Sequence, residues 1–299
     1  MTQQNDSAPA AAPAPLPRML PFYWSLRREL WEHRSVYIAP LAIATIALFG
    51  FLLSTFGLAH AVRTAASVGS RKVEALAIPY IFVAVSVLVT GLLVGMFYSL
   101  AALHGERRDR SILFWKSLPV SDLTTVLAKA AVPILVLPTV IITVIFAAQL
   151  IMLGLSTLIV LVNGIDPRAL WAHMPVPFLW LELLRGLPFI ALWYAPLFAW
   201  LLLVSAWARR APFLWAVATP LALGLVEQLA LGTHAVWSWL GLRMVGAFAG
   251  AYDGATTEAH HASHLDPGGW ASPHVWVGLA LAAAFLAAAV RLRRSREPI

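Results

Sequence analysis

The residues best suited to metal or proton chemistry gather between positions 253 and 266. This stretch carries Asp253, Glu258, His260, His261, His264 and Asp266. His260 and His264 stand four positions apart, a spacing that on a helix lets two imidazoles share a metal ion. The HExxH pattern of zinc hydrolases is absent, and no other histidine-rich segment offers a further ligand. A metal site, a solvated loop and a pH-sensitive gate therefore remain open, and we assign no metal ligand.

Polar residues inside or beside apolar runs form a second group of candidates. Glu227 is the one acid that lies clearly inside an apolar run, and Gln149 lies inside another. Ionisable residues within a membrane span are functional candidates by default. We therefore expect Glu227 to line a transport pathway or to pair with Arg243 or His234, and we take Glu227, Arg243 and Gln149 as pathway or gate residues. Polar groups this sparse predict no catalytic residue.

The connection His104–Lys129 reads HGERRDRSILFWKSLPVSDLTTVLAK and holds an apolar, aromatic cluster within a charged loop. A charged start at 106–110 is followed by the cluster at 112–118, and Pro119 then stops any helix. Exposing such a cluster to water costs free energy. It must therefore enter either the membrane interface or a groove on a partner protein, where an aromatic anchor suits docking.

Nucleotide-binding and cysteine chemistry are not predicted for this chain. There is no GxxxxGK[ST] loop and no GxGxxG after a strand, so we expect no nucleotide site or other cofactor here. The chain has 0 cysteines, which excludes disulfides and thiolate ligands.

The elements that must position these residues are membrane helices. Of the 299 residues 60% are hydrophobic and only 12% are charged, whereas soluble domains average about 25% charged. Six continuous apolar runs reach the roughly 20 residues that cross a bilayer, which favours helices over a barrel. The predicted spans are about 36–58, 78–103, 130–153, 188–207, 212–231 and 275–292. The third run continues to about Val162, so its helix is either tilted or extends past the membrane.

The net charge of +7 indicates orientation. Basic residues concentrate before the first span, in the second and fourth connections and after the last span, in the basic tail 293–299. The positive-inside rule then places both termini in the cytoplasm. Arginines at these positions are explained by topology and anionic lipid, so we expect no nucleic-acid partner.

Segments outside the spans are predicted to lie on the membrane surface. Residues 1–17 are expected to be a disordered tail. Residues 18–35 have the pattern of an amphipathic helix that lies in the inner membrane interface and contacts membrane lipid. The alternative is that this helix is a plain juxtamembrane anchor with no functional role. The apolar string PFLWLELLRG, residues 177–186, is expected to be an interfacial segment before the fourth span. The connection 232–274 begins with a stripe that predicts a re-entrant or interfacial helix, which either shapes an outer gate or packs passively on the bundle.

The string ERRDRSILFWKSLPVSD, placed between the second and third of six spans, resembles the permease subunits of bacterial ABC-type exporters of the type-2 permease superfamily. The resemblance covers the six-span layout, the amphipathic entry helix and this loop. It implies a bacterial inner-membrane protein that pairs with a second copy and with a cytosolic ABC ATPase, which supplies the ATP and Mg sites. Residues 106–122 would be the coupling segment. Within it, the residues assigned to ATPase coupling are Glu106, Arg107, Arg108, Ile112, Phe114, Trp115, Lys116 and Leu118.

The sequence therefore predicts an all-α membrane permease that carries out no covalent chemistry itself. Its substrate is expected to be hydrophobic or amphipathic, because the spans offer little charge to hold a polar solute. Two alternatives stay open. One is a membrane enzyme or metal-binding factor that uses the external histidines, and the other is a scaffold that binds a partner through the same loop but transports nothing.

Overall fold

The computed structural model of the chain describes residues 19–55, 70–117, 120–171, 176–253 and 272–295. Within these residues every regular element is a helix. Six stretches among them are long and apolar enough to cross a membrane. The expectation of an all-α protein with six candidate spans is confirmed.

The helices are listed here in chain order with their bounds: α1 (Met19–Glu32), α2 (Ser35–Ser54), α4 (Ser70–Arg108), α5 (Ile112–Ser117), α6 (Asp122–Ala131), the π-helical segment η2 (Val132–Val136), α7 (Leu137–Val162), α8 (Pro167–Trp171), α9 (Val176–Trp207), α10 (Pro212–Leu231), α11 (Ala235–Asp253) and α12 (Pro273–Ser295).

The third span shows the largest extension beyond its predicted bounds. α6, η2 and α7 follow one another without a break from Asp122 to Val162, which is 41 residues. Pro133 and Pro138 each lack a backbone N–H, and the π-helical turn lies where these prolines interrupt the regular hydrogen-bond ladder. The apolar run to Val162 is therefore helical throughout.

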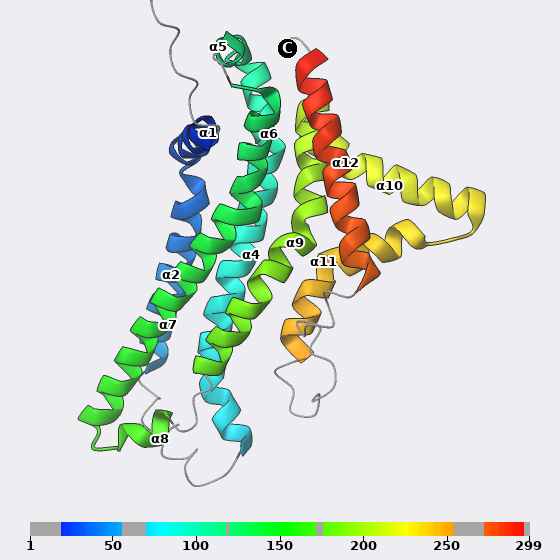
Figure 1. Ribbon diagram of the computed structural model, residues 1–299. Coiled ribbons are helices and arrows are strands. Elements are labelled where there is room, and N and C mark those ends of the chain that lie inside the picture. The colour runs from blue at the N-terminus through cyan, green and yellow to red at the C-terminus, as the bar shows by residue number, and fades with distance from the viewer. Residues whose placement is uncertain (1–18, 56–69, 118–119, 172–175, 254–271, 296–299) are drawn as a thin grey trace, which may run out of the picture.

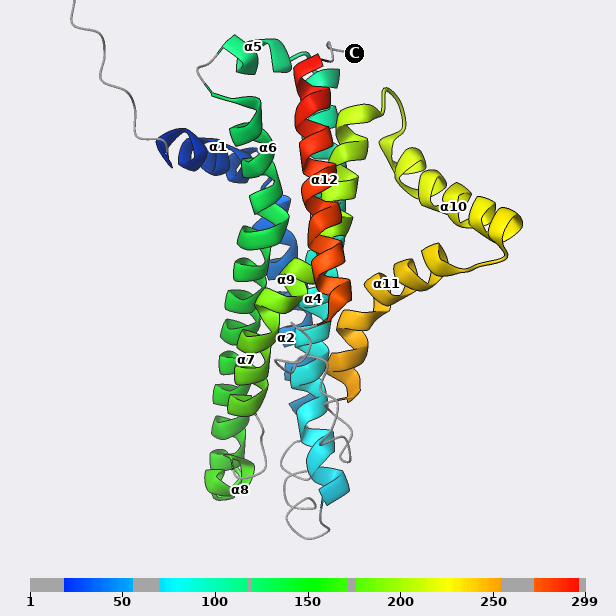
Figure 2. The ribbon, with the colours of Figure 1, turned by 45° about the vertical axis from the view of Figure 1, so that its right-hand side comes forward.

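The long helices α2, α4, α7, α9 and α12 run lengthwise through the molecule, while α1 and α5 lie across its end (Figures 1 and 2). The short helices α1 and α5 are seen nearly end-on in Figure 1 and lengthwise in Figure 2. The last turns of α12 reach this same end, which we call the α5 end. The opposite end, where α8 lies, is the α8 end.

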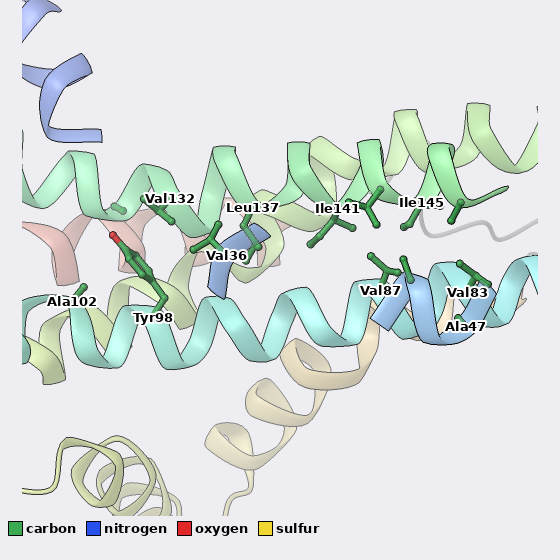
Figure 3. Packing of buried hydrophobic residues seen from close by; sticks show 14 of the residues in the cluster. Val36, Ala47, Val83, Val87, Tyr98, Ala102, Val132, Leu137, Ile141 and Ile145 are labelled. Atoms are coloured by element: carbon green, nitrogen blue, oxygen red, sulfur yellow. The ribbon is translucent and has the colours of Figure 1, made fainter. Parts of the chain in front are cut away.

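The main core forms where α2, α4 and α7 meet (Figure 3). Val83 and Val87 of α4 lie opposite Ile141 and Ile145 of α7, and all four are buried. Close approach is set by glycine, because a Cβ on Gly91 would stand 2.1 Å from the Ile141 side chain. Small residues at a helix contact are the usual basis of packing between membrane helices.

Helix α10 extends away from the bundle and α11 runs back to it, so that the two helices form an arm (Figures 1 and 2). The arm starts after Ala211, whose φ of 47° is left-handed, and it turns at Gly232, whose φ is 65°. Inside the arm Gly224 lets Trp237 approach, because a Cβ there would lie 2.7 Å from the indole. Only 11% of the apolar stretch of α10 is buried inside the structure, the lowest share among the six candidate spans.

Three segments expected outside the spans can be compared with the structure. Within the segment 18–35, residues 19–32 form α1, and a helix between the fifth and sixth candidate spans is present as α11. Residues 177–186 were expected to form an interfacial segment before the fourth span, and in the structure they belong to the first part of the continuous helix α9. Pro188 lies within that helix and does not end it.

Candidate functional site

The predicted coupling segment forms a short helix at the α5 end. Arg110, with φ of 57°, closes α4 and turns the chain into α5. Ile112 is the anchor, because it is 2% exposed and lines a small cavity with Leu103 and Arg293. Its neighbours Leu113 and Phe114 are 59% and 61% exposed. The segment is thus fixed on one side and presents two apolar side chains on another.

The other predicted coupling residues divide into buried, exposed and undescribed groups. Glu106 and Arg107 are buried, whereas Arg108 is exposed. The side chains of Trp115 and Lys116, and the whole of Leu118, lie outside the described residues. Because Glu106 and Arg107 are buried, they contact other residues of this chain and present little surface to a partner protein.

Arg107 joins the end of α4 to the end of α9. Its Nη1 donates to the carbonyl oxygens of Ala206 at 2.6 Å and Ala208 at 3.3 Å. The last carbonyls of a helix have no partner within it, so a guanidinium there satisfies them. Nearby, the Ser205 hydroxyl accepts from the backbone N–H of Leu103 at 3.0 Å. These bonds hold the two helix ends together directly beside α5.

Glu106 belongs to a set of six charged residues that we call the ionic cluster. Its members come from α1, α4, α6 and α12, and they are Arg28, Glu29, Glu106, Asp122, Lys129 and Arg293. Three acids face three bases, so the cluster is neutral when all are ionised.

Lys129 lies at the centre of the ionic cluster and is only 1% exposed. Its Nζ donates to Glu29 Oε1 at 2.7 Å and lies 3.1 Å from Glu106 Oε1. From α1, Arg28 Nη2 reaches the same two oxygens, at 2.9 Å and 2.8 Å. Each carboxylate is thereby shared between two cations, and α1 is bonded to α4 and α6.

Arg293 closes the cluster from the last helix. Its Nη1 donates to Glu106 Oε2 at 2.5 Å, and its Nε donates to Asp122 Oδ1 at 3.0 Å. Glu106 and Asp122 stand at the two ends of the loop that carries α5. Asp122 is free for this contact because Ser121 caps α6, accepting from the N–H of Thr124 at 3.1 Å. One guanidinium therefore binds both ends of the α5 loop.

Glu29 is the buried acid that α1 contributes to the cluster. Tyr98 donates its phenolic hydrogen to Glu29 Oε2 at 2.9 Å. Burial by itself raises the pKa of the Glu29 carboxyl. The charge and hydrogen bond of Lys129, together with the charge of Arg28, lower the pKa by more than burial raises it. Its pKa therefore lies below the usual range, and the carboxylate is ionised at neutral pH.

Geometry alone would also group Glu29, Glu32 and His33 as potential metal ligands. The Glu29 carboxylate is already bound by Lys129 and Arg28, whose positive charges oppose a bound cation. The arrangement therefore fits an ion-pair network and not a metal centre.

The predicted pathway residues lie apart from one another, and none belongs to the ionic cluster. Gln149 is buried, donates to the carbonyl oxygen of Tyr80 at 3.1 Å and accepts from the Trp180 indole N–H at 2.7 Å. It therefore joins α7 to α4 and α9.

Glu227 and Arg243 do not pair with each other, and both instead hold α11. Glu227 accepts from the backbone N–H groups of Ala235 and Val236 at 2.7 Å and 2.8 Å, so it caps the start of α11. Of the three roles expected for Glu227, pairing with Arg243 is not observed, because Arg243 donates to the carbonyl oxygens of Trp193 and His274. The first backbone N–H groups of a helix have no partner within the helix, so a carboxylate there is stabilised by accepting from them. This explains why Glu227 binds the start of α11 and not Arg243.

Arg243 fastens α11 to α9 and α12. Its guanidinium lies 4.3 Å from the Trp193 ring centroid and 5.3 Å from that of Trp239. Close approach to α12 depends on Gly278, where a Cβ would stand 2.1 Å from Arg243 Nη2. Two of the three predicted pathway or gate residues, Glu227 and Arg243, thus hold α11 in place.

The histidine-rich stretch falls almost wholly outside the described residues. The metal site, the solvated loop and the pH-sensitive gate therefore all remain predictions. Comparisons with known proteins found no match to this chain among family models, curated proteins or solved structures.

Proposed function

We propose that this chain is the membrane subunit of an ATP-driven exporter of the type-2 ABC permease kind. Two copies would form the pathway, and a cytosolic ABC ATPase carrying ATP and Mg would dock at the α5 end. The chain would span the bacterial inner membrane with both termini in the cytoplasm. It would perform no covalent chemistry and would move a hydrophobic or amphipathic substrate.

The observation that carries this proposal is the exposure of Leu113 and Phe114 on a firmly held helix. Both side chains are more than half exposed, while Ile112 beside them is buried. The ends of the loop are fixed by Arg293. A short helix that is anchored on one side and presents apolar side chains on another suits a groove on another protein.

The position of α5 favours a protein partner over lipid. Along the bundle axis α5 lies farther out than α1 in both views (Figures 1 and 2). If α1 lies in the membrane interface, as its exposed aromatic residues indicate, α5 stands beyond that interface, in the water phase. Two exposed apolar side chains there call for a protein partner.

The ionic cluster offers a path for motion from α5 into the membrane. A push on α5 displaces the ends of the loop, which are held at Glu106 and Asp122. Glu106 is two residues from the end of α4, and Asp122 begins the long helix that continues through η2 into α7. The π-helical turn at 132–136 is a break in regular hydrogen bonding where such a helix can bend.

The arm offers a surface for an apolar substrate. An open groove of about 460 Å³ runs along α10 beside the end of α9. It is lined by Trp207, Trp215, Ala218, Thr219, Ala222, Leu223 and Val226. Its lining is apolar, a property that suits a hydrophobic or amphipathic substrate.

Copurification with the candidate ATPase tests the proposal. The candidate ATPase is sought among the neighbouring reading frames as a soluble protein with a P-loop. It is then coexpressed with this chain and captured through a tag on the chain. Phe114→Ala, alone and with Leu113→Ala, should reduce captured ATPase at least tenfold and abolish stimulation of ATP hydrolysis. The matched control is Phe97→Ala, because Phe97 is 62% exposed but lies on α4 within a candidate span.

Retention of the ATPase by the double variant, with normal stimulation, would refute docking through α5. Capture without any ATP-dependent transport in vesicles would favour the scaffold alternative. Equal losses for Phe97→Ala and Phe114→Ala would mean that the effect is not specific to α5.

A further inference from the structure

Helix α1 has two faces of different character. One face carries Tyr23, Trp24 and Trp31, which are 55%, 54% and 68% exposed. The other face carries Arg28 and Glu29, which belong to the ionic cluster. A single 14-residue helix thus connects the molecular surface to the buried charges that hold the α5 loop.

Arg27 is fixed in the middle of the aromatic face. Its guanidinium carbon lies 5.2 Å from the Trp24 ring centroid and 5.0 Å from the Trp31 ring centroid. Stacking on two indoles orients the guanidinium while leaving it exposed. Among the described residues, Arg27 forms no ion pair with the nearby acids of α1. Glu29 is bound by Arg28 and Lys129, and Glu32 is bound by Arg28.

The chemistry and orientation of this face fit a phospholipid surface. α1 runs crosswise to the candidate spans (Figure 2), so its axis lies parallel to a membrane that those spans cross. Tryptophan and tyrosine are enriched at the level of lipid headgroups, and an arginine held among them meets lipid phosphate. A protein groove would more often receive a few central aromatic anchors than a row of aromatics along the helix.

We propose that α1 binds anionic phospholipid of the adjacent leaflet through Arg27, and that this binding sets the position of the ionic cluster. The regulatory half of the proposal rests on the proposed function. A lipid phosphate bound to Arg27 fixes the depth of α1 in the membrane interface and its rotation about its own axis. Arg28 and Glu29 follow, because they are on the same helix, and they bear directly on Glu106 and Lys129. Activity driven by the ATPase should therefore require anionic lipid.

Lipid binding is tested on the purified full chain without any ATPase. Phosphatidylglycerol and phosphatidylcholine with the same acyl chains are titrated, and bound lipid is counted by native mass spectrometry. Wild type should prefer phosphatidylglycerol. Arg27→Gln should weaken that preference about fivefold, the effect of one basic residue at an anionic surface. Trp24→Leu/Trp31→Leu should also weaken it, because an apolar face remains but no ring orients the guanidinium.

Arg210→Gln is the matched control, because it removes another exposed arginine outside α1. It should leave the preference within twofold of wild type. Equal losses from Arg27→Gln and Arg210→Gln would overturn the proposal, since they would show general surface charge. Loss of ATPase capture by Arg27→Gln with unchanged lipid preference would also overturn it and assign the face to a protein partner.

Regulation is measured as ATPase stimulation in nanodiscs of the two lipids. Wild type should be stimulated several-fold more in phosphatidylglycerol, and Arg27→Gln should respond equally in both lipids while capturing the ATPase normally. A lipid-independent wild type would overturn the regulatory half. Failure of the proposed function is distinct, because it would appear as no ATPase capture by wild type, with the native mass spectrometry result unaffected.

Discussion

The Nη1 of Arg293 donates to Oε2 of Glu106 at 2.5 Å, although 187 positions separate the two residues. Arg293 lies in the last turn of α12, and Glu106 lies at the end of α4 just before α5. Because Arg293 also binds Asp122, the last helix contacts both ends of the α5 loop. The last turn of α12 and the loop that carries the proposed docking segment are therefore bonded to each other.

Arg293→Gln should uncouple the subunit while leaving partner binding intact. The variant loses the bonds to Glu106 and Asp122, but Leu113 and Phe114 remain on the surface. We expect ATPase capture within twofold of wild type and stimulation of hydrolysis reduced at least tenfold. Arg294→Gln is the control, because Arg294 is next in sequence but exposed. Normal stimulation by the Arg293 variant would show that the contact has no part in coupling.

Lys129→Met should cost more stability than any surface substitution on this chain. Removing the central cation leaves Glu29 and Glu106 buried with less compensation. Breaking a buried ion pair from one side typically costs about 3–5 kcal/mol. Thermal unfolding of the detergent-purified protein measures the effect. Adding Glu29→Gln to Lys129→Met should restore part of the loss, since the two residues are in contact. Strict additivity of the two changes would contradict the assigned ion pair.

The six spans could be predicted because lipid imposes a simple length and composition rule on helices. Local signals also succeeded: Ser121, a residue type favoured at helix N-termini, caps α6, and the backbone is not helical at Val120, just after Pro119. These features depend on residues that are close in sequence. They require no knowledge of which helices become neighbours.

The ionic cluster could not be predicted in the same way, because its members are distant in sequence. Arg293 looked like one more basic residue after the last span, which the positive-inside rule explains without a partner. A usable signal lay in Glu29, an acid between Leu26 and Leu30 on the apolar side of an amphipathic helix. Another lay in Lys129, which stands between buried alanines at the start of an apolar run. Each indicated a buried charge, but neither identified its partner.

Acid should destabilise the protein partly through Glu29. Its carboxyl pKa is lowered in the folded state, because Lys129 and Arg28 outweigh the effect of burial. A lowered folded pKa stabilises the protein above the unfolded value of about 4.3, and that stability is lost as the pH falls through the folded value. The melting temperature should therefore respond little to Glu29 between pH 7 and pH 5 and fall more steeply below about pH 4.

Glu29→Gln removes this titration while keeping the side chain's shape. The variant should be less stable than wild type at pH 7, and the difference should shrink as the pH falls below 4. A constant difference between the two melting curves across this range would show that ionised Glu29 adds nothing to stability.

Gly278→Ala should release the arm from the bundle. The added Cβ would meet Arg243 Nη2 at 2.1 Å, and that guanidinium is held by the carbonyl oxygens of Trp193 and His274. Displacing a buried, hydrogen-bonded guanidinium should cost about 1–3 kcal/mol.

Gly154→Ala is the control, because nothing lies within 4 Å of its Cβ position on α7, and alanine favours a helix. The chain has 0 cysteines, so single cysteines introduced at Met244 and Leu279 can report the α11–α12 separation by spin-label distance. A longer or broader distance distribution in Gly278→Ala, with no change in Gly154→Ala, is the expected result. Unchanged distributions in both would mean that Arg243 does not hold α11 against α12.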